Sequence, residues 1–148
     1  MLNIENLLNG LMDHDDKKAY EYLKELEERS ISSSEVYSFF DNFVEMIDSD
    51  KSYVRTRGIL LIAANAKWDT DNKIDGIIDK FLGCVTDEKP ITARQCIRTL
   101  PTIVKYKRGL KGCIVNALRD ADLSNYRESM HPLILKDIQQ ALNEIGGL

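Results

Sequence analysis

The sequence predicts an all-α protein built from about four helix-turn-helix repeats stacked as an α-solenoid. Three observations predict this fold. Four segments share the apolar spacing i, i+3, i+4, i+7 that gives a helix one buried face. A second helical pattern follows each of them, and no stretch alternates with period two for long enough to form a strand. The 148 residues suffice for one domain with a substantial core.

The four apolar stripes mark the first helix of each repeat. They lie within residues 4–11, 36–47, 74–85 and 110–118. Phe40 and Phe81 fall on these stripes, so we expect both rings in the core. The helix near residues 53–66 is apolar almost all round, which is typical of a central helix packed between neighbours.

The second helices align in phase with one another. An aspartate near the end of each first helix precedes by seven residues the position held by Tyr20, Arg55, Arg94 and Arg127. The repeats are then about 33 to 39 residues long, within the range of two-helix solenoid units. We predict a single domain, 1–148, with approximate repeats 1–31, 32–70, 71–108 and 109–148. Pro101 and Pro132 fall inside helical patterns, so we expect a kink or a delayed start at each.

This pattern resembles the HEAT-repeat family. The matching segments read DSDKSYVRTRGILLIAA, DEKPITARQCIRTL and DADLSNYRESM: an acidic helix end, a short turn, and a second helix opening with an apolar-Arg pair. The turn differs from the usual spacing by about one residue, and Tyr20 replaces the arginine in the first repeat. The resemblance implies right-handed stacked helix pairs whose second helices line a concave face. It also implies a scaffold or binding surface without a shared catalytic activity, and short bacterial proteins of this kind look similar.

Composition favours a cytoplasmic protein with no membrane span and no cofactor. The longest uncharged run, GILLIAANA (58–66), is too short to cross a bilayer, and the first residues lack the basic segment of a secretory signal. Cys84, Cys96 and Cys113 are odd in number and lie far apart, which predicts buried thiols in a reducing compartment. His14 and His131 lie in opposite terminal repeats, so we predict no metal site.

Charge is distributed unevenly along the chain. Residues 1–50 hold 13 acidic and 4 basic side chains, whereas residues 89–119 hold 8 basic and no acidic ones. The repeat alignment places Arg94, Arg98 and Lys105 on one face together with Arg55 and Arg127. The predicted binding surface adds the cations around the next helix end and comprises Arg55, Arg94, Arg98, Lys105, Lys107, Arg108, Lys111 and Arg127. Such a face could hold phosphates or an acidic protein patch. The repeat arginines could instead be structural and bind the preceding aspartate or helix-end carbonyls.

Three functions follow from this surface. The first is a non-enzymatic protein-interaction or scaffold module. The second is a nucleic-acid-binding module that uses the basic stretch 89–119. The third is a DNA repair enzyme, because Trp68-Asp69 resembles the tryptophan and aspartate of HEAT-like alkylation-repair glycosylases, which work in a basic groove.

Overall fold

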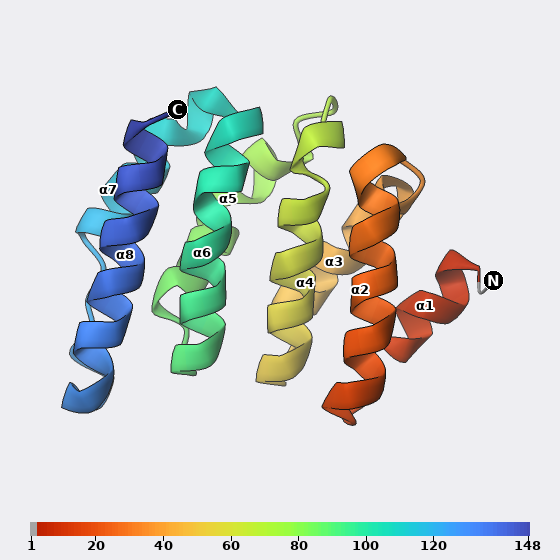
Figure 1. Cartoon of the computed structure of the whole chain (residues 1–148), viewed down its shortest axis with the longest axis horizontal. Coiled ribbons are helices and arrows are strands. Elements are labelled where there is room, and N and C mark those ends of the chain that lie inside the picture. Colours follow the sequence, from red (N-terminus) through yellow and green to blue (C-terminus); the bar gives the residue numbers. More distant parts are fainter. Residues whose placement is uncertain (1–2) are drawn as a thin grey trace. The chain divides into compact units, whose positions relative to one another are not determined.

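The structure, a computed structural model, describes residues 3–148 and is all-α. Eight α-helices and several short 3-10 turns make up 78% of it, and the described residues contain no strand. The prediction of an all-α protein is therefore confirmed. The chain divides into two compact units, residues 1–70 (unit 1) and residues 71–148 (unit 2), and Figure 1 shows the course of the helices in each.

Unit 1 contains two helix pairs. Its helices are α1 (Ile4–Gly10), α2 (Asp16–Ser32), α3 (Phe40–Ile47) and α4 (Ser52–Ala64). Helix α2 packs against α1 on one side and α4 on the other, and α3 packs on α4. Asp15 is the N-cap of α2, and its carboxylate accepts a hydrogen bond from the Lys17 backbone N–H at 3.0 Å.

Helix α4 packs against α2 and α3 and is buried on nearly all sides, as its sequence predicts. Ile59, Leu61 and Ile62 are fully buried. Gly58 allows α3 to approach closely, because a Cβ at that position would lie 2.8 Å from the Met46 Cβ and 2.9 Å from the Phe43 carbonyl oxygen. The missing side chain thus sets the spacing between these two helices.

Unit 2 also contains two helix pairs. Its helices are α5 (Lys73–Gly83), α6 (Pro90–Tyr106), α7 (Lys111–Arg119) and α8 (His131–Gly146). Helix α6 is the central element, in contact with α7, with α8 and with the 3-10 turn Cys84–Thr86 that follows α5. Phe81 is fully buried in unit 2, and Phe40 is fully buried in unit 1. Both core predictions are confirmed.

The last helix pair departs from the register that the sequence alignment predicts. Its second helix begins at His131, with Pro132 in the first turn, so the delayed start predicted at Pro132 is confirmed. Pro101, by contrast, lies inside α6, which continues to Tyr106. Arg127 lies before α8 in extended backbone and is exposed, so its predicted place on the face of a second helix is wrong. The reason is that the connection 120–127 is longer than the connection within each of the other three helix pairs.

Tyr126 occupies the space under this longer connection. Its ring is buried, and its hydroxyl donates a hydrogen bond to the carbonyl oxygen of Asp87 in the turn before α6. Burial, followed by the nearby Asp87 carboxylate, raises the pKa of Tyr126 to about 12. The tyrosine therefore ties the start of α8 to the start of α6.

Two further expectations concern cysteines and membranes. Cys84 and Cys96 are buried free thiols, but Cys113 is exposed, so the prediction of three buried thiols is wrong at that position. Cys113 lies near the start of the short helix α7, whose inner face is carried by Ile114 and Leu118 instead. No helix in the described part of the chain is long and apolar enough to cross a membrane.

Candidate binding face on helices α6 and α8

A buried aspartate organises the surface where α6 and α8 lie side by side. Asp137 of α8 is 8% exposed and accepts a hydrogen bond from Arg94 of α6, with 2.5 Å between Nε and Oδ2. That bond raises the pKa of Arg94 above its ordinary value, against the opposing effect of burial. Arg94, predicted as a ligand-binding cation, thus serves mainly to join two helices.

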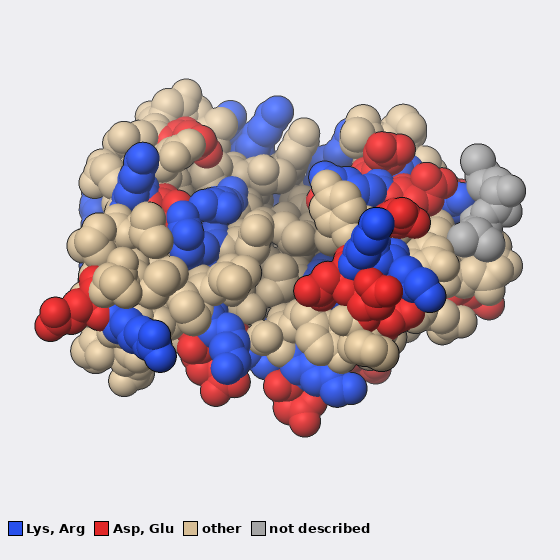
Figure 2. All heavy atoms as spheres, turned by 60° about the horizontal axis from the view of Figure 1, so that its bottom comes forward, with Lys and Arg blue, Asp and Glu red and all other residues tan. Residues whose placement is uncertain are grey.

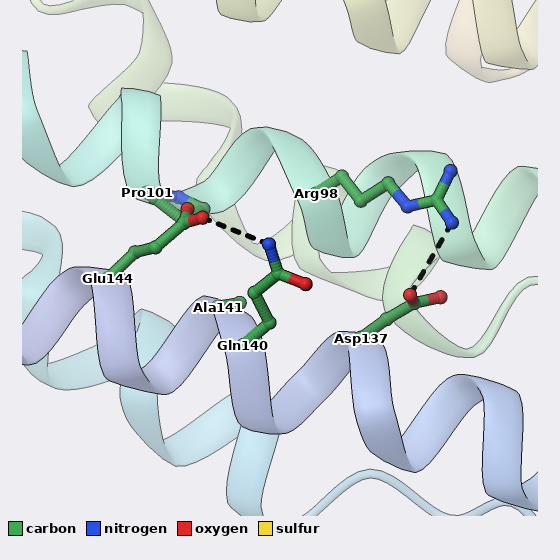
Figure 3. A pocket seen from close by; sticks show the side chains of 6 residues that line it. All are labelled: Arg98, Pro101, Asp137, Gln140, Ala141 and Glu144. Atoms are coloured by element: carbon green, nitrogen blue, oxygen red, sulfur yellow. Dashed lines mark hydrogen bonds and ion pairs between the residues drawn. The ribbon is translucent and has the colours of Figure 1, made fainter.

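Arg98 reaches the same carboxylate from one turn further along α6. Its Nη2 lies 3.5 Å from the Asp137 Oδ1, and its side chain remains 51% exposed. Figure 3 shows its guanidinium beside a groove of about 250 Å³. The residues lining this groove are Arg98, Pro101, Asp137, Gln140, Ala141 and Glu144. Arg98 is therefore the predicted cation that the structure places best for contact with a ligand.

The opposite end of the groove is acidic. Glu144 lies two turns along α8 from Asp137, and Gln140 donates a hydrogen bond to its carboxylate at 3.3 Å (Figure 3). Pro101, which also lines the groove, has no backbone N–H to donate to the carbonyl oxygen of Ile97, one turn earlier in α6. The groove thus offers a cation at one end and hydrogen-bond acceptors at the other.

Two apolar side chains lie on the same face at the N-terminal ends of both helices. Ile91 of α6 is 71% exposed, and Leu133 of α8 is 42% exposed. Ile91 lies seven residues before Arg98, and Leu133 lies four residues before Asp137, so helical geometry places each on the groove side of its helix. We call the surface formed by Ile91, Arg98, Leu133, Gln140 and Glu144 the α6–α8 face.

Two other predicted cations are used inside the fold. Arg55 is buried and donates a hydrogen bond to the Ser49 carbonyl oxygen at 3.1 Å, in the turn before its own helix. Lys107 is 9% exposed and forms an ion pair with Asp75 at 2.9 Å. Their prediction as binding residues is not supported by this geometry, whereas the structural alternative for Arg55 fits it.

The four remaining predicted cations are exposed but do not gather in one place. Lys105, Arg108 and Lys111 lie at the corner between α6 and α7. Arg127 follows Tyr126, whose hydroxyl is bonded to Asp87 in the turn before α6. Helix α6 separates these two groups by about 25 Å, the length of its 17 residues. Figure 2 accordingly shows separate blue side chains with tan surface between them over unit 2, not one continuous basic field.

The dipeptide Trp68-Asp69 is bonded within unit 1. The Trp68 ring N–H donates to the Ser30 carbonyl oxygen at 2.7 Å, at the C-terminal end of α2. Asp69 is buried and accepts a hydrogen bond from the Tyr37 hydroxyl at 2.6 Å. Among the described residues, no group of three or more His, Cys, Asp or Glu side chains is placed to hold a metal ion.

Sequence reasoning missed two charged residues that the structure makes central. Asp137 falls on the apolar stripe of α8, between Ile134 and Ile138, and a carboxylate at a core position could have identified it. Arg57 is 6% exposed and donates to the carbonyl oxygens of Leu11 and Asp13 at 2.7 and 2.8 Å. The repeat alignment singled out Arg55 and gave no reason to expect a structural role for Arg57, two residues later.

Comparisons with known proteins do not assign this face to a family. No family model matches the chain, and searches of curated proteins and of solved structures found no match.

Proposed function

We propose that this chain is a HEAT-like α-solenoid that works as a non-enzymatic interaction module and binds a protein partner through the α6–α8 face. The observation that carries the proposal is the pair Ile91 and Leu133. Both are exposed on the N-terminal side of the half-exposed Arg98 guanidinium, and the groove extends from Arg98 in the other direction, toward Glu144. Exposed apolar side chains rimmed by polar groups are typical of protein–protein contact surfaces.

Nucleic acid is the second candidate, on a different surface. The corner between α6 and α7 carries Lys105, Arg108 and Lys111, all exposed, with Tyr106 43% exposed among them. Cations with an interleaved aromatic side chain suit a phosphate backbone and an unstacked base. We place this candidate second because the cations at this corner are few.

The repair-enzyme reading has the least support. The ring N–H of Trp68 and the carboxylate of Asp69 are both engaged in hydrogen bonds inside unit 1. An aspartate that is 4% exposed does not present its carboxylate to an extruded base. This geometry gives the repair-enzyme function no support.

The experiment compares two leucines on the same helix. The purified chain is immobilised, partners captured from the source cell are identified by mass spectrometry, and direct binding to each purified partner is measured by calorimetry. We expect Leu133→Ser and Ile91→Ser to weaken binding at least tenfold, since a buried apolar side chain at an interface contributes strongly. Leu135→Ser is the control, because Leu135 is 55% exposed but points about 200° away around α8. Equal affinity of all variants for the partner would exclude the α6–α8 face as the binding surface.

The nucleic-acid candidate is tested by fluorescence anisotropy with labelled single- and double-stranded DNA and RNA, at low and near-physiological salt. Binding that weakens with salt and is lost in the double variant Arg108→Glu plus Lys111→Glu would support it. Absence of binding at low salt would exclude it.

A further inference from the structure

We propose that the α6–α8 face binds an acidic linear peptide segment, whose carboxylate pairs with Arg98 and whose apolar side chain packs on Ile91 and Leu133. This inference rests on the proposed function and names the chemistry of the partner. It is carried by the geometry around Asp137 and by the charges along the two helices.

The positive charge of Arg98 is not fully neutralised by the carboxylate that it contacts in the fold. One carboxylate, Asp137, faces two guanidiniums, and Arg94 holds it at the shorter distance, 2.5 Å against 3.5 Å. Helix α6 contains no acidic residue of its own. The three groups together leave one net positive charge, and it lies on the exposed side chain. A ligand carboxylate would complete a bidentate pair with that guanidinium, which Asp137 already orients.

The groove suits a peptide better than a nucleic acid. Its volume of about 250 Å³ has room for a short piece of chain and one or two side chains. Peptide backbone offers N–H donors as well as acceptors, and the exposed Glu144 carboxylate and the Gln140 side chain can accept from them (Figure 3). A nucleic-acid strand carries a negative charge at every nucleotide, so Glu144 would repel the phosphates next to one held by Arg98.

Helical geometry predicts the spacing of the recognised residues. Ile91 and Arg98 are two turns apart on α6, or about 10 Å. An extended or polyproline peptide covers that distance in three or four residues. The expected motif is therefore an Asp or Glu three or four residues from a large apolar residue.

The test uses a displayed library of random 12-residue peptides and the purified full chain. We expect the selected peptides to be enriched in Asp and Glu at the predicted distance from an apolar residue. Representative peptides are then synthesised with a fluorescent label, and their dissociation constants are measured by anisotropy. Arg98→Gln should weaken binding by about tenfold or more, since a hydrogen-bonded charge pair is lost. Arg98→Lys should retain part of the affinity, because it keeps the charge and loses the fork geometry.

Arg119→Gln is the matched control, because it removes the same charge from an exposed arginine at the end of α7. Four results would overturn the inference: no selected peptide, selection of basic or uncharged peptides, equal weakening by Arg98→Gln and Arg119→Gln, or Arg98-dependent binding of a labelled oligonucleotide instead. Selected peptides without acidic residues that still depend on Leu133 would remove the acidic-peptide inference and leave the proposed interaction function intact. If neither the selected peptides nor the captured protein partners depended on the α6–α8 face, both the acidic-peptide inference and the proposed interaction function would be wrong.

Discussion

Replacing Arg57 by Met tests how unit 1 is held together. Arg57 donates to the carbonyl oxygens of Leu11 and Asp13 and forms an ion pair with Asp16 at 3.0 Å. Each charge-assisted bond to a carbonyl contributes about 1.5–3 kcal/mol. Asp16 is 86% exposed, so that ion pair contributes at most about 1 kcal/mol. Met keeps the apolar stem, so we expect Arg57→Met to lower the free energy of unfolding by about 3 kcal/mol.

The assay is urea unfolding followed by tryptophan fluorescence. Trp68 is the single tryptophan in the chain and is bonded to the end of α2, so its emission reports on unit 1. The unfolding midpoint should fall by about 1.5 M urea if the slope is about 2 kcal/mol per molar. Asp16→Asn is the control and should change stability by less than about 1 kcal/mol. A loss below 1 kcal/mol for Arg57→Met, or equal losses for the two variants, would refute the carbonyl-binding role.

Three further predictions concern packing and pH. Gly58→Ala should destabilise unit 1 by about 1–3 kcal/mol, because the added methyl group meets the closely packed helix α3. Gly76→Ala should instead stabilise unit 2 by about 0.5–1 kcal/mol, because no atom lies within 4 Å of the added Cβ and alanine favours a helix. Urea unfolding followed by circular dichroism measures both changes, which have opposite signs. Phe40→Asp should unfold unit 1 by burying an unpaired charge, and an unchanged fluorescence melt would contradict its core position. One of the six tyrosines should titrate near pH 12 by absorbance at 295 nm, and Tyr126→Phe should remove that transition.

The raised pKa of Tyr126 makes the free energy of unfolding depend on pH in the alkaline range. The folded pKa of Tyr126, about 12, lies above the value of about 10 expected in the unfolded chain. Its contribution is therefore fully present below pH 10 and is lost as the pH rises toward 12, where the unfolded state releases its proton first. In Tyr126→Phe this part of the alkaline destabilisation should disappear, and pH-dependent urea melts between pH 9 and 12 would measure the difference.

Periodicity predicted the helices because each one buries a regular apolar stripe. Ile4, Leu7 and Leu11 of the first helix needed no information from the rest of the chain. The start of the last helix was expected too early because the alignment assumed a short turn, although Pro132 marked the true start of α8. The length of a connection depends on the side chain that packs beneath it, here Tyr126. Such tertiary packing cannot be read from a local sequence pattern.

The candidate site was predicted only in part, for a similar reason. Arg98 is exposed, and its role as a binding cation stays a prediction. For Arg94 the structural alternative fits, but the partner expected from the sequence was the aspartate of the preceding turn, whereas the structure pairs Arg94 with Asp137 of α8. The aspartate that holds both of them follows Arg94 by 43 residues, and no local pattern links such a pair. Charge runs in a sequence show how many cations exist. They do not show which of them are already neutralised by a carboxylate from another helix.

The pairing of Arg94 with Asp137 also sets an order of events during synthesis. Translation at about 5–20 residues per second delivers Asp137 roughly 2–9 s after Arg94. Throughout that interval α6 has neither its carboxylate nor the helix that covers its apolar side. Unit 2 can therefore acquire its final packing only when α8 has left the ribosome. A nascent chain halted before that point would leave the side of α6 that packs on α8 open to chaperones and proteases, whereas all four helices of unit 1 would already have been synthesised.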